Sequence, residues 1–157
     1  MVQLIRDFVK RFATKISIDD KLVIKKANRY FLLNENIRKS LMKSFFFAGS
    51  LLGENRKGEF VPGFALLRLI AKEDSNKIVV DRKSEWLFIC GRDLFKRGIA
   101  NVTKAVKPGD FVLVLNQNHE CLGFGKIIRN LDITTDGVVV ENLLDLGDFL
   151  RRESKIA

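Results

Sequence analysis

The second half of the chain alternates short apolar runs with glycine-containing turns, and this pattern limits the possible folds more than any other feature. The strand-like runs are 77–80, 110–115, 121–128 and 138–140. Strands of this length that recur with turns at spacings of roughly 8 to 12 residues are typical of a small β-barrel. Short helices are expected over 85–90 and, as a closing helix, over 143–152.

The first part of the chain mixes helical and strand patterns. Over 2–13 the apolar residues recur at three- and four-residue steps with cations on the other side, which predicts an amphipathic helix. Two β-rich runs, 21–25 and 29–33, predict a hairpin whose turn suits Asn28. Asn34 can then cap the N-terminus of a helix over 35–42.

A Phe-rich run over 44–52 predicts a buried strand that ends at Gly53. Its partner is expected over 59–61, after a polar turn. The three consecutive phenylalanines at 45–47 are expected to fill a core rather than stack bases, because successive strand residues face opposite sides.

The middle of the chain predicts a domain junction. After the Pro62-Gly63 break, a mostly buried helix is expected over 64–71. It ends in the polar stretch 72–76, which suits a boundary between domains. The sequence therefore predicts an α+β N-terminal domain over 1–74 and a mainly β domain over 75–157.

The composition is that of a globular protein. Hydrophobic residues make up 46% of the 157 residues, and 13 of them are Phe, which is ample for a packed core. The longest uncharged apolar stretch, 44–53, is about half of the ~20 residues that a membrane helix needs, so no membrane span is expected. Charged residues interrupt the N-terminal apolar positions, so no secretory signal is expected. Cys90 and Cys121 lie in unlike contexts, which favours a reducing compartment and a cytoplasmic location.

The formal net charge of +9 favours polyanionic partners, with nucleic acid as the first candidate. The charge is uneven along the chain. Residues 1–75 carry 15 Lys and Arg against 8 Asp and Glu, whereas residues 76–157 carry 13 against 11. In the second half, the position of the cations must therefore matter more than their total.

Four segments of the second half follow one another in a specific order. They are 77–81, 84–99, Lys107-Pro108-Gly109-Asp110-Phe111-Val112 and Leu122-Gly123-Phe124-Gly125. Together they resemble a PUA domain over about half of the chain. With the N-terminal unit and the ending 145–153, the chain resembles the Nip-seven family of ribosome-biogenesis factors, in an archaeal form.

The resemblance implies a fold and a role. The fold is an α+β N-terminal domain followed by a PUA-type mainly-β pseudo-barrel. In that family the PUA domain binds RNA, the first domain supports protein contacts, and the protein acts in large-subunit rRNA maturation alongside the RNA exosome. The implied partners are thus an rRNA precursor, U-rich or structured, and the exosome or other ribosome-assembly proteins. A monomer without cofactor or catalytic activity is expected.

Two basic groups are the candidate RNA-binding residues: Arg92, Lys96 and Arg97, and then Arg151, Arg152 and Lys155. Gly91 and Gly98 bracket the first group and, as turn glycines, would let an RNA backbone approach closely. Arginine supplies a forked set of donors that matches phosphate. As a hypothesis, we expect the two groups to lie on the same face and to form a single groove.

Each group also has an ordinary structural interpretation. The first could be a solvated face, and the second a frayed basic terminus. Lys25, Lys26 and Arg29 fit a solubilising hairpin turn better than an RNA path. His119 with Cys121 lacks the four paired ligands of a zinc site, and the pairs Asp19-Asp20 and Glu73-Asp74 suit turns and caps rather than catalysis.

Two other functions stay open at this point. PUA domains are often attached to RNA-modifying enzymes, so the chain could be a modification enzyme or the subunit that guides its substrate. It could also be a protein-interaction module whose apolar N-terminal half is the working surface and whose RNA binding is incidental.

Overall fold

Two hairpins build the first sheet in the computed structural model, which describes residues 3–41 and 48–153. The chain begins with α1 (Gln3–Lys10), as the amphipathic pattern predicts, and a 3-10 turn, η1 (Asp20–Leu22), precedes the sheet. Strands β1 (Val23–Lys26) and β2 (Arg29–Leu32) confirm the predicted hairpin. The Asn34 side chain accepts a hydrogen bond from the Ile37 amide at 2.8 Å, which confirms the predicted cap of α2 (Glu35–Ser40).

The second hairpin corrects one prediction. Strand β3 (Ser50–Arg56) runs through Gly53 rather than ending there, and its turn to β4 (Glu59–Pro62) is at Lys57 and Gly58. Gly53 has a φ of +151°, and an added Cβ there would lie 2.5 Å from the Phe60 ring, so glycine lets this ring close over the strand. Residues 42–47, which include the three consecutive phenylalanines, lie outside the described residues.

Helix α3 (Phe64–Lys72) follows the Pro62-Gly63 break and buries Leu66, Leu67 and Ile70, as predicted. The chain then passes to the second sheet through Ser75 and Asn76, which are both buried.

The second sheet has six strands in the order β6-β10-β9-β8-β5-β7 and curls into a pseudo-barrel. Its elements are β5 (Lys77–Val80), α4 (Arg82–Ile89), β6 (Leu94–Phe95), η2 (Lys96–Gly98), β7 (Ile99–Val102), β8 (Phe111–Leu115), β9 (Cys121–Ile127), β10 (Val138–Asp145) and α5 (Leu146–Glu153). All neighbouring pairs are antiparallel except β5 with β8.

Three bounds differ from the sequence prediction. Helix α4 begins three residues early because the Asp81 side chain caps it by accepting a hydrogen bond from the Ser84 amide at 2.7 Å. Strand β10 extends to Asp145, so the closing helix begins at Leu146 rather than at 143. The short strands β6 and β7 were not predicted.

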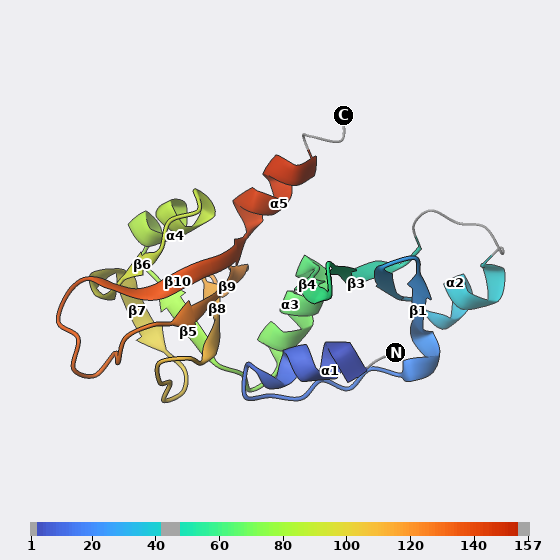
Figure 1. Ribbon diagram of the computed structural model, residues 1–157, viewed down its shortest axis with the longest axis horizontal. Helices are drawn as coiled ribbons and strands as arrows, with labels where there is room; N and C mark the ends of the chain where they lie inside the picture. The colour runs from blue at the N-terminus through green and yellow to red at the C-terminus, as the bar shows by residue number, and fades with distance from the viewer. Residues whose placement is uncertain (1–2, 42–47, 154–157) are drawn as a thin grey trace.

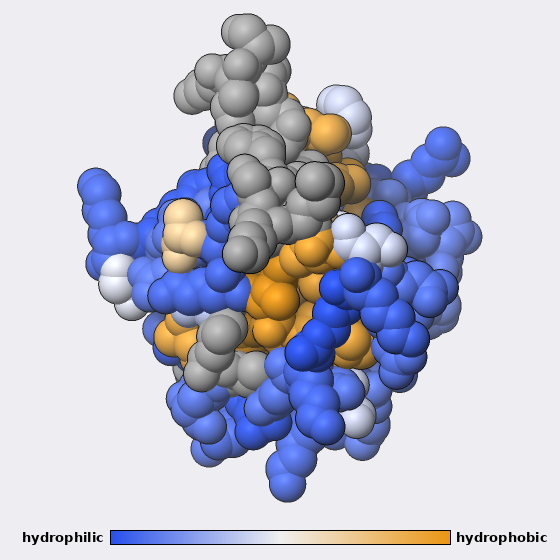
Figure 2. All heavy atoms as spheres, turned by 90° about the vertical axis from the view of Figure 1, so that its right-hand side faces the viewer, coloured by the Kyte–Doolittle hydropathy of each residue, from blue (hydrophilic) through white to orange (hydrophobic). Residues whose placement is uncertain are grey.

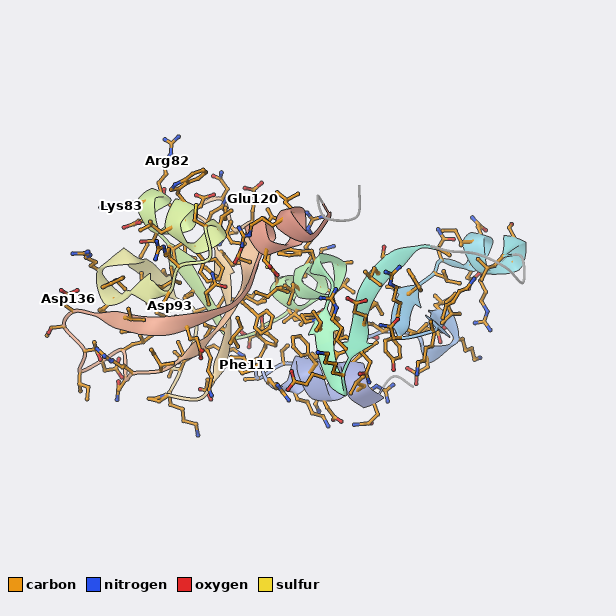
Figure 3. The ribbon with its side chains drawn as sticks, turned by 45° about the horizontal axis from the view of Figure 1, so that its top comes forward. Arg82, Lys83, Asp93, Phe111, Glu120 and Asp136 are labelled. Atoms are coloured by element: carbon orange, nitrogen blue, oxygen red, sulfur yellow. The ribbon has the colours of Figure 1, made fainter. Side chains whose placement is uncertain are left out.

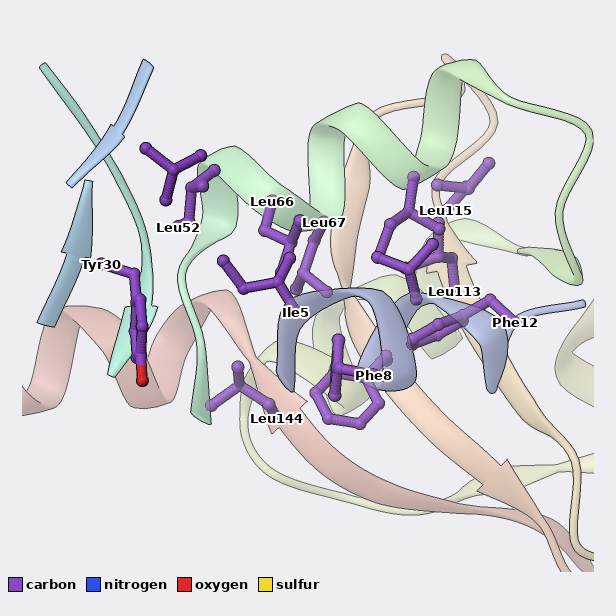
Figure 4. Packing of buried hydrophobic residues seen from close by; sticks show 14 of the residues in the cluster. Ile5, Phe8, Phe12, Tyr30, Leu52, Leu66, Leu67, Leu113, Leu115 and Leu144 are labelled. Carbon is purple, nitrogen blue, oxygen red and sulfur yellow. The ribbon is translucent and has the colours of Figure 1, made fainter. Parts of the chain in front are cut away.

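The two sheets lie at opposite ends of the molecule, with α1 and α3 between them (Figure 1). One hydrophobic cluster joins both halves: it includes Phe8 and Phe12 of α1 and its following turn, and Phe124 and Leu144 of the second sheet (Figure 4). The Phe12 ring centroid lies 5.7 Å from that of Phe124. The halves therefore share a core as well as a connection.

A second cluster fills the pseudo-barrel, and a third lies under α2 at the far end of the first sheet. Figure 2 looks onto that end, where apolar side chains gather in the centre and hydrophilic ones surround them. Within the described part of the chain, every helix is too short or too polar to cross a membrane.

Candidate nucleic-acid interface

Helix α4 carries an exposed aromatic residue beside exposed cations. Arg82 and Lys83 stand in its first turn and point outward from the helix (Figure 3). Trp86, one turn after Arg82, is 68% exposed, although tryptophan usually buries its ring. Because residues four apart share a helix face, Arg82 and Trp86 form one outward surface. An exposed indole beside guanidinium groups can stack an unpaired base while the cations contact phosphates.

The start of α5 is held against the end of α4 by a buried carboxylate. Asp145 is 3% exposed; it accepts a hydrogen bond from the Asp148 amide at 2.7 Å and lies 3.4 Å from Nη2 of Arg151. Nη1 of Arg151 also donates to the Ile89 carbonyl, the last of α4, at 3.2 Å. A Cβ at Gly147 would run into that same carbonyl oxygen, so only glycine permits this approach.

The main chain at Arg92 is linked to the same carboxylate through Asn142. The Asn142 side-chain amide donates to the Arg92 carbonyl and to Asp145, each at 3.4 Å. The preceding residue, Gly91, has a φ of +86° and an open turn, as predicted, with Arg151 as the nearest side chain. Asp145 therefore contacts the Arg151 side chain directly and the main chain of Arg92 through Asn142.

Lys96 has a structural contact that the sequence did not indicate. Its Nζ donates to the Leu131 carbonyl at 2.6 Å, and its amide donates to the Gly137 carbonyl at 2.9 Å. These bonds hold the β9–β10 loop, so the lysine anchors that loop. Arg97 is exposed, with its guanidinium carbon 5.3 Å from the centre of the Phe95 ring.

Gly98 differs from its predicted role. It is buried, and an added Cβ would meet the Ser84 side chain of α4, so it serves packing rather than backbone approach. The Arg152 side chain and Lys155 lie outside the described residues. That all six cations share one face stays a prediction.

Arg82, Lys83 and Trp86 were missed as candidates because the predicted helix began at Glu85. The signal was present in Asp81, an N-cap residue three positions before Ser84. If the helix is started after Asp81, Arg82 and Trp86 are four residues apart in it and therefore lie on one face.

Several of the other charged residues considered in the sequence contact side chains or backbone within the protein. Arg29 pairs with Glu54 at 3.6 Å, and Nζ of Lys25 lies 5.6 Å from the Tyr30 ring centre. Asp19 caps η1, and Asp74 pairs with Lys104 at 2.9 Å. Over 3–41 and 48–153 there is no group of three His, Cys, Asp or Glu side chains that could hold a metal ion.

The two cysteines should differ sharply in reactivity. Burial raises the pKa of the Cys121 thiol to about 11, and its Sγ lies 3.7 Å from the Gly123 carbonyl, whereas Cys90 is exposed at the end of α4. The thiolate is the reactive form, so at pH 8 only about a thousandth of Cys121 would be reactive.

Iodoacetamide at pH 8 should therefore alkylate Cys90 first, and mass spectrometry of tryptic peptides should find Cys121 unmodified until the pH approaches its raised pKa or urea unfolds the chain. Equal labelling of both thiols in the folded protein would contradict the burial of Cys121.

Three comparisons bear on this interface. A family model described as the UPF0113 PUA domain matches residues 76–154. A UPF0113 protein of Archaeoglobus fulgidus is 34% identical over 90 residues, which are 54% of this chain and 50% of that protein. A tRNA-guanine(15) transglycosylase of Methanosphaera stadtmanae is 27% identical over 114 residues, 73% of this chain but 15% of the enzyme. The chain thus spans half or less of these relatives.

The fold of both halves has a solved counterpart. A conserved PUA domain protein from Thermoplasma acidophilum superposes with a TM-score of 0.62 at 18% identity, over 97% of this chain and 93% of that one. The second sheet with its helices is therefore a PUA pseudo-barrel, preceded by the α+β region that this relative shares.

Proposed function

Because the chain belongs to the UPF0113 PUA domain family, we propose that it is a non-catalytic RNA-binding factor. The RNA lies on a surface that we name the α4 surface. It consists of Arg82, Lys83 and Trp86 of α4, and we propose that the exposed Arg92, Arg97 and Arg151 extend it. PUA domains are RNA-binding modules, and this surface supplies the two contacts that an RNA strand needs, phosphate neutralisation and base stacking.

The observation that carries the proposal is the exposure of Trp86 one helical turn from Arg82, which is also exposed on α4. The Trp86 indole is 68% exposed, and holding this apolar surface in water is unfavourable in free energy. A base that stacks on the ring removes part of this surface from water and so favours binding. The Arg151 side chain and the main chain of Arg92 come from segments far apart in the chain, and both are linked to the buried Asp145. A surface built from several segments can contact an RNA strand at more points than a single charged helix can.

The cellular role follows from the resemblance to the Nip-seven family. We place the protein in ribosome biogenesis, bound to an rRNA precursor in the cytoplasm, with the exosome or another assembly protein on its N-terminal half. The two-part fold is consistent with this proposal, because an α+β region precedes the PUA domain, as the resemblance implies.

The first test is the salt dependence of RNA binding. Labelled U-rich and structured rRNA fragments are titrated with the wild type and with an Arg92→Gln, Arg97→Gln variant between 50 and about 200 mM salt. Each lost phosphate contact should reduce the slope of log affinity against log salt by about 0.7 on a single strand. The variant should therefore bind more weakly and with a shallower slope.

A control variant, Lys39→Gln with Lys57→Gln, removes the same charge from exposed positions of the N-terminal half. It should keep the wild-type slope. Equal loss in both variants would mean that the net charge, and not the α4 surface, attracts RNA, and no binding by the wild type would reject the proposal outright. Trp86→Ala tests stacking separately, because it should weaken binding without changing the slope.

One observation favours a second function, that of a subunit guiding RNA to a modifying enzyme. The similarity to a tRNA-guanine(15) transglycosylase covers 73% of this chain but 15% of the enzyme, so the shared part is a small portion of that protein. Guidance would appear as tighter binding to tRNA than to rRNA fragments of equal length. A mass-shifted RNA made by the pure chain would instead show that it is an enzyme.

A further inference from the structure

A pocket of about 610 Å³ opens where the two halves meet. Phe111, which is labelled in Figure 3, is one of its lining residues. The wall of the pocket comes from the end of α1, from the crossing between the sheets, from the loop before β8 and from β9. The residues that line it include Lys10, Arg11, Asn76, Asp110, Phe111 and Lys126. We name it the seam pocket.

The seam pocket is electropositive. Three cations line it against one carboxylate, Asp110, whose Oδ2 already accepts the Lys107 amide at 2.9 Å. Arg11 and Lys126 take part in no ion pair among the described residues, although Glu141 is the cross-strand neighbour of Lys126 on β10. Lys10 pairs with Asp7 at 3.3 Å, but both side chains are more than half exposed, so water weakens this pair.

One of the three cations, Arg11, is held in place before any ligand binds. The guanidinium carbon of Arg11 lies 5.2 Å from the centre of the Phe111 ring, a cation–π distance. Phe111 is paired in register with Lys126, so both side chains stand on the same face of the sheet. A site whose donors are already ordered loses less entropy on binding.

The crossing between the sheets makes the floor of the pocket rigid. Asn76 is buried; its amide donates to the Phe12 carbonyl and its carbonyl accepts the Leu113 amide, each at 2.9 Å. Its side-chain amide donates to the Phe111 carbonyl at 3.3 Å. These bonds tie α1 to β8 on either side of the opening.

We propose that the seam pocket binds a phosphorylated nucleoside, either as a free nucleotide or as the phosphorylated end of an RNA strand. The cations account for the phosphate. The volume falls in the range of small-molecule sites and far exceeds a phosphate ion, and Phe111 in the lining supplies an aromatic contact for the rest of the ligand. This site is separate from the α4 surface and does not depend on the proposed function.

The test uses uridine 5′-monophosphate, uridine, inorganic phosphate and a 5′-phosphorylated oligouridylate, titrated calorimetrically at low salt into the full chain. Uridine 5′-monophosphate should bind at least tenfold more tightly than uridine or phosphate alone. An Arg11→Gln, Lys126→Gln variant should lose at least tenfold in affinity, and the Lys39→Gln, Lys57→Gln control should lose none. Ala105→Trp blocks the opening from an exposed position without altering charge and should also abolish binding.

The relative affinities of these ligands distinguish a free nucleotide from the end of an RNA strand and also show whether the proposal fails. If the phosphorylated oligonucleotide binds through Arg11 and Lys126 more tightly than the mononucleotide, the ligand is a strand end; the reverse order indicates a free nucleotide. Binding by phosphate as tight as by the nucleotide, or binding unaffected by Ala105→Trp, would overturn the proposal. An Arg92→Gln, Arg97→Gln variant should retain nucleotide binding even if it loses RNA, which keeps this result apart from the test of the α4 surface.

Discussion

Replacement of Phe12 by alanine is expected to destabilise both halves of the protein at once. Phe12 is fully buried, and its ring centroid lies 5.4 Å from Phe8 in its own half and 5.9 and 5.7 Å from Phe111 and Phe124 in the other. Loss of a buried Phe side chain leaves a cavity and costs about 3–5 kcal/mol of unfolding free energy. Urea unfolding followed by circular dichroism measures this loss.

Hydrogen exchange measures which strands lose stability in this variant. In the Phe12→Ala variant the amides of β8 and β9 should exchange faster, although the substitution is in the N-terminal half, because they pack on the shared core. Phe31→Ala is the control: Phe31 is also fully buried but belongs to the cluster under α2. It should leave β8 and β9 protected. If Phe12→Ala also leaves them protected, the shared core does not couple the halves.

Replacement of Gly123 by alanine is expected to break the pairing of β9 with β10. Gly123 has a φ of +148°, which a side chain rarely adopts, and an added Cβ would run into the Leu144 carbonyl oxygen and lie 2.9 Å from the Asp145 Cα. Both obstacles are backbone, and Gly123 is paired with β8 on its other side, so neither strand can move without losing hydrogen bonds. We expect a loss of about 3–5 kcal/mol in unfolding free energy.

The matched control for this clash is Gly109→Ala. Gly109 also has a positive φ, +99°, but an added Cβ there would meet nothing within 4 Å. It should cost only the backbone strain, about 1–2 kcal/mol. Equal losses from the two alanines in thermal or urea unfolding would mean that φ alone, without the contact to Leu144, explains the need for glycine at 123. Because Asp145 holds Arg151, the Gly123 variant should also weaken RNA binding.

Much of the fold could be predicted because local sequence decides it. The helix of 2–13 follows from its apolar period, and α2 follows from Asn34, whose side chain caps it as predicted. Strands β5, β8 and β9 are dense apolar runs between turns, and such runs bury themselves whatever their partners are.

The site was predicted less completely, and particular residues show why. Lys96 looked like a free cation, but its Nζ finds the Leu131 carbonyl 35 positions away, and no local pattern indicates such a bond. Gly98 looked like an open turn, yet α4 packs on it. Strand β6 has two residues and exists because β10 provides its hydrogen bonds.

The sequence by itself determined the elements whose stability comes from neighbours in the chain: amphipathic helices, the capped helix, the hairpins and the order of motifs that marks the PUA domain. Only the tertiary structure decided which cation contacts Asp145, which one anchors a loop, and that the end of α1 and the ends of β8 and β9 line the seam pocket. The physical reason is that these features depend on contacts between segments far apart in the chain, and such contacts form only when the shared core around Phe12 brings the two halves together.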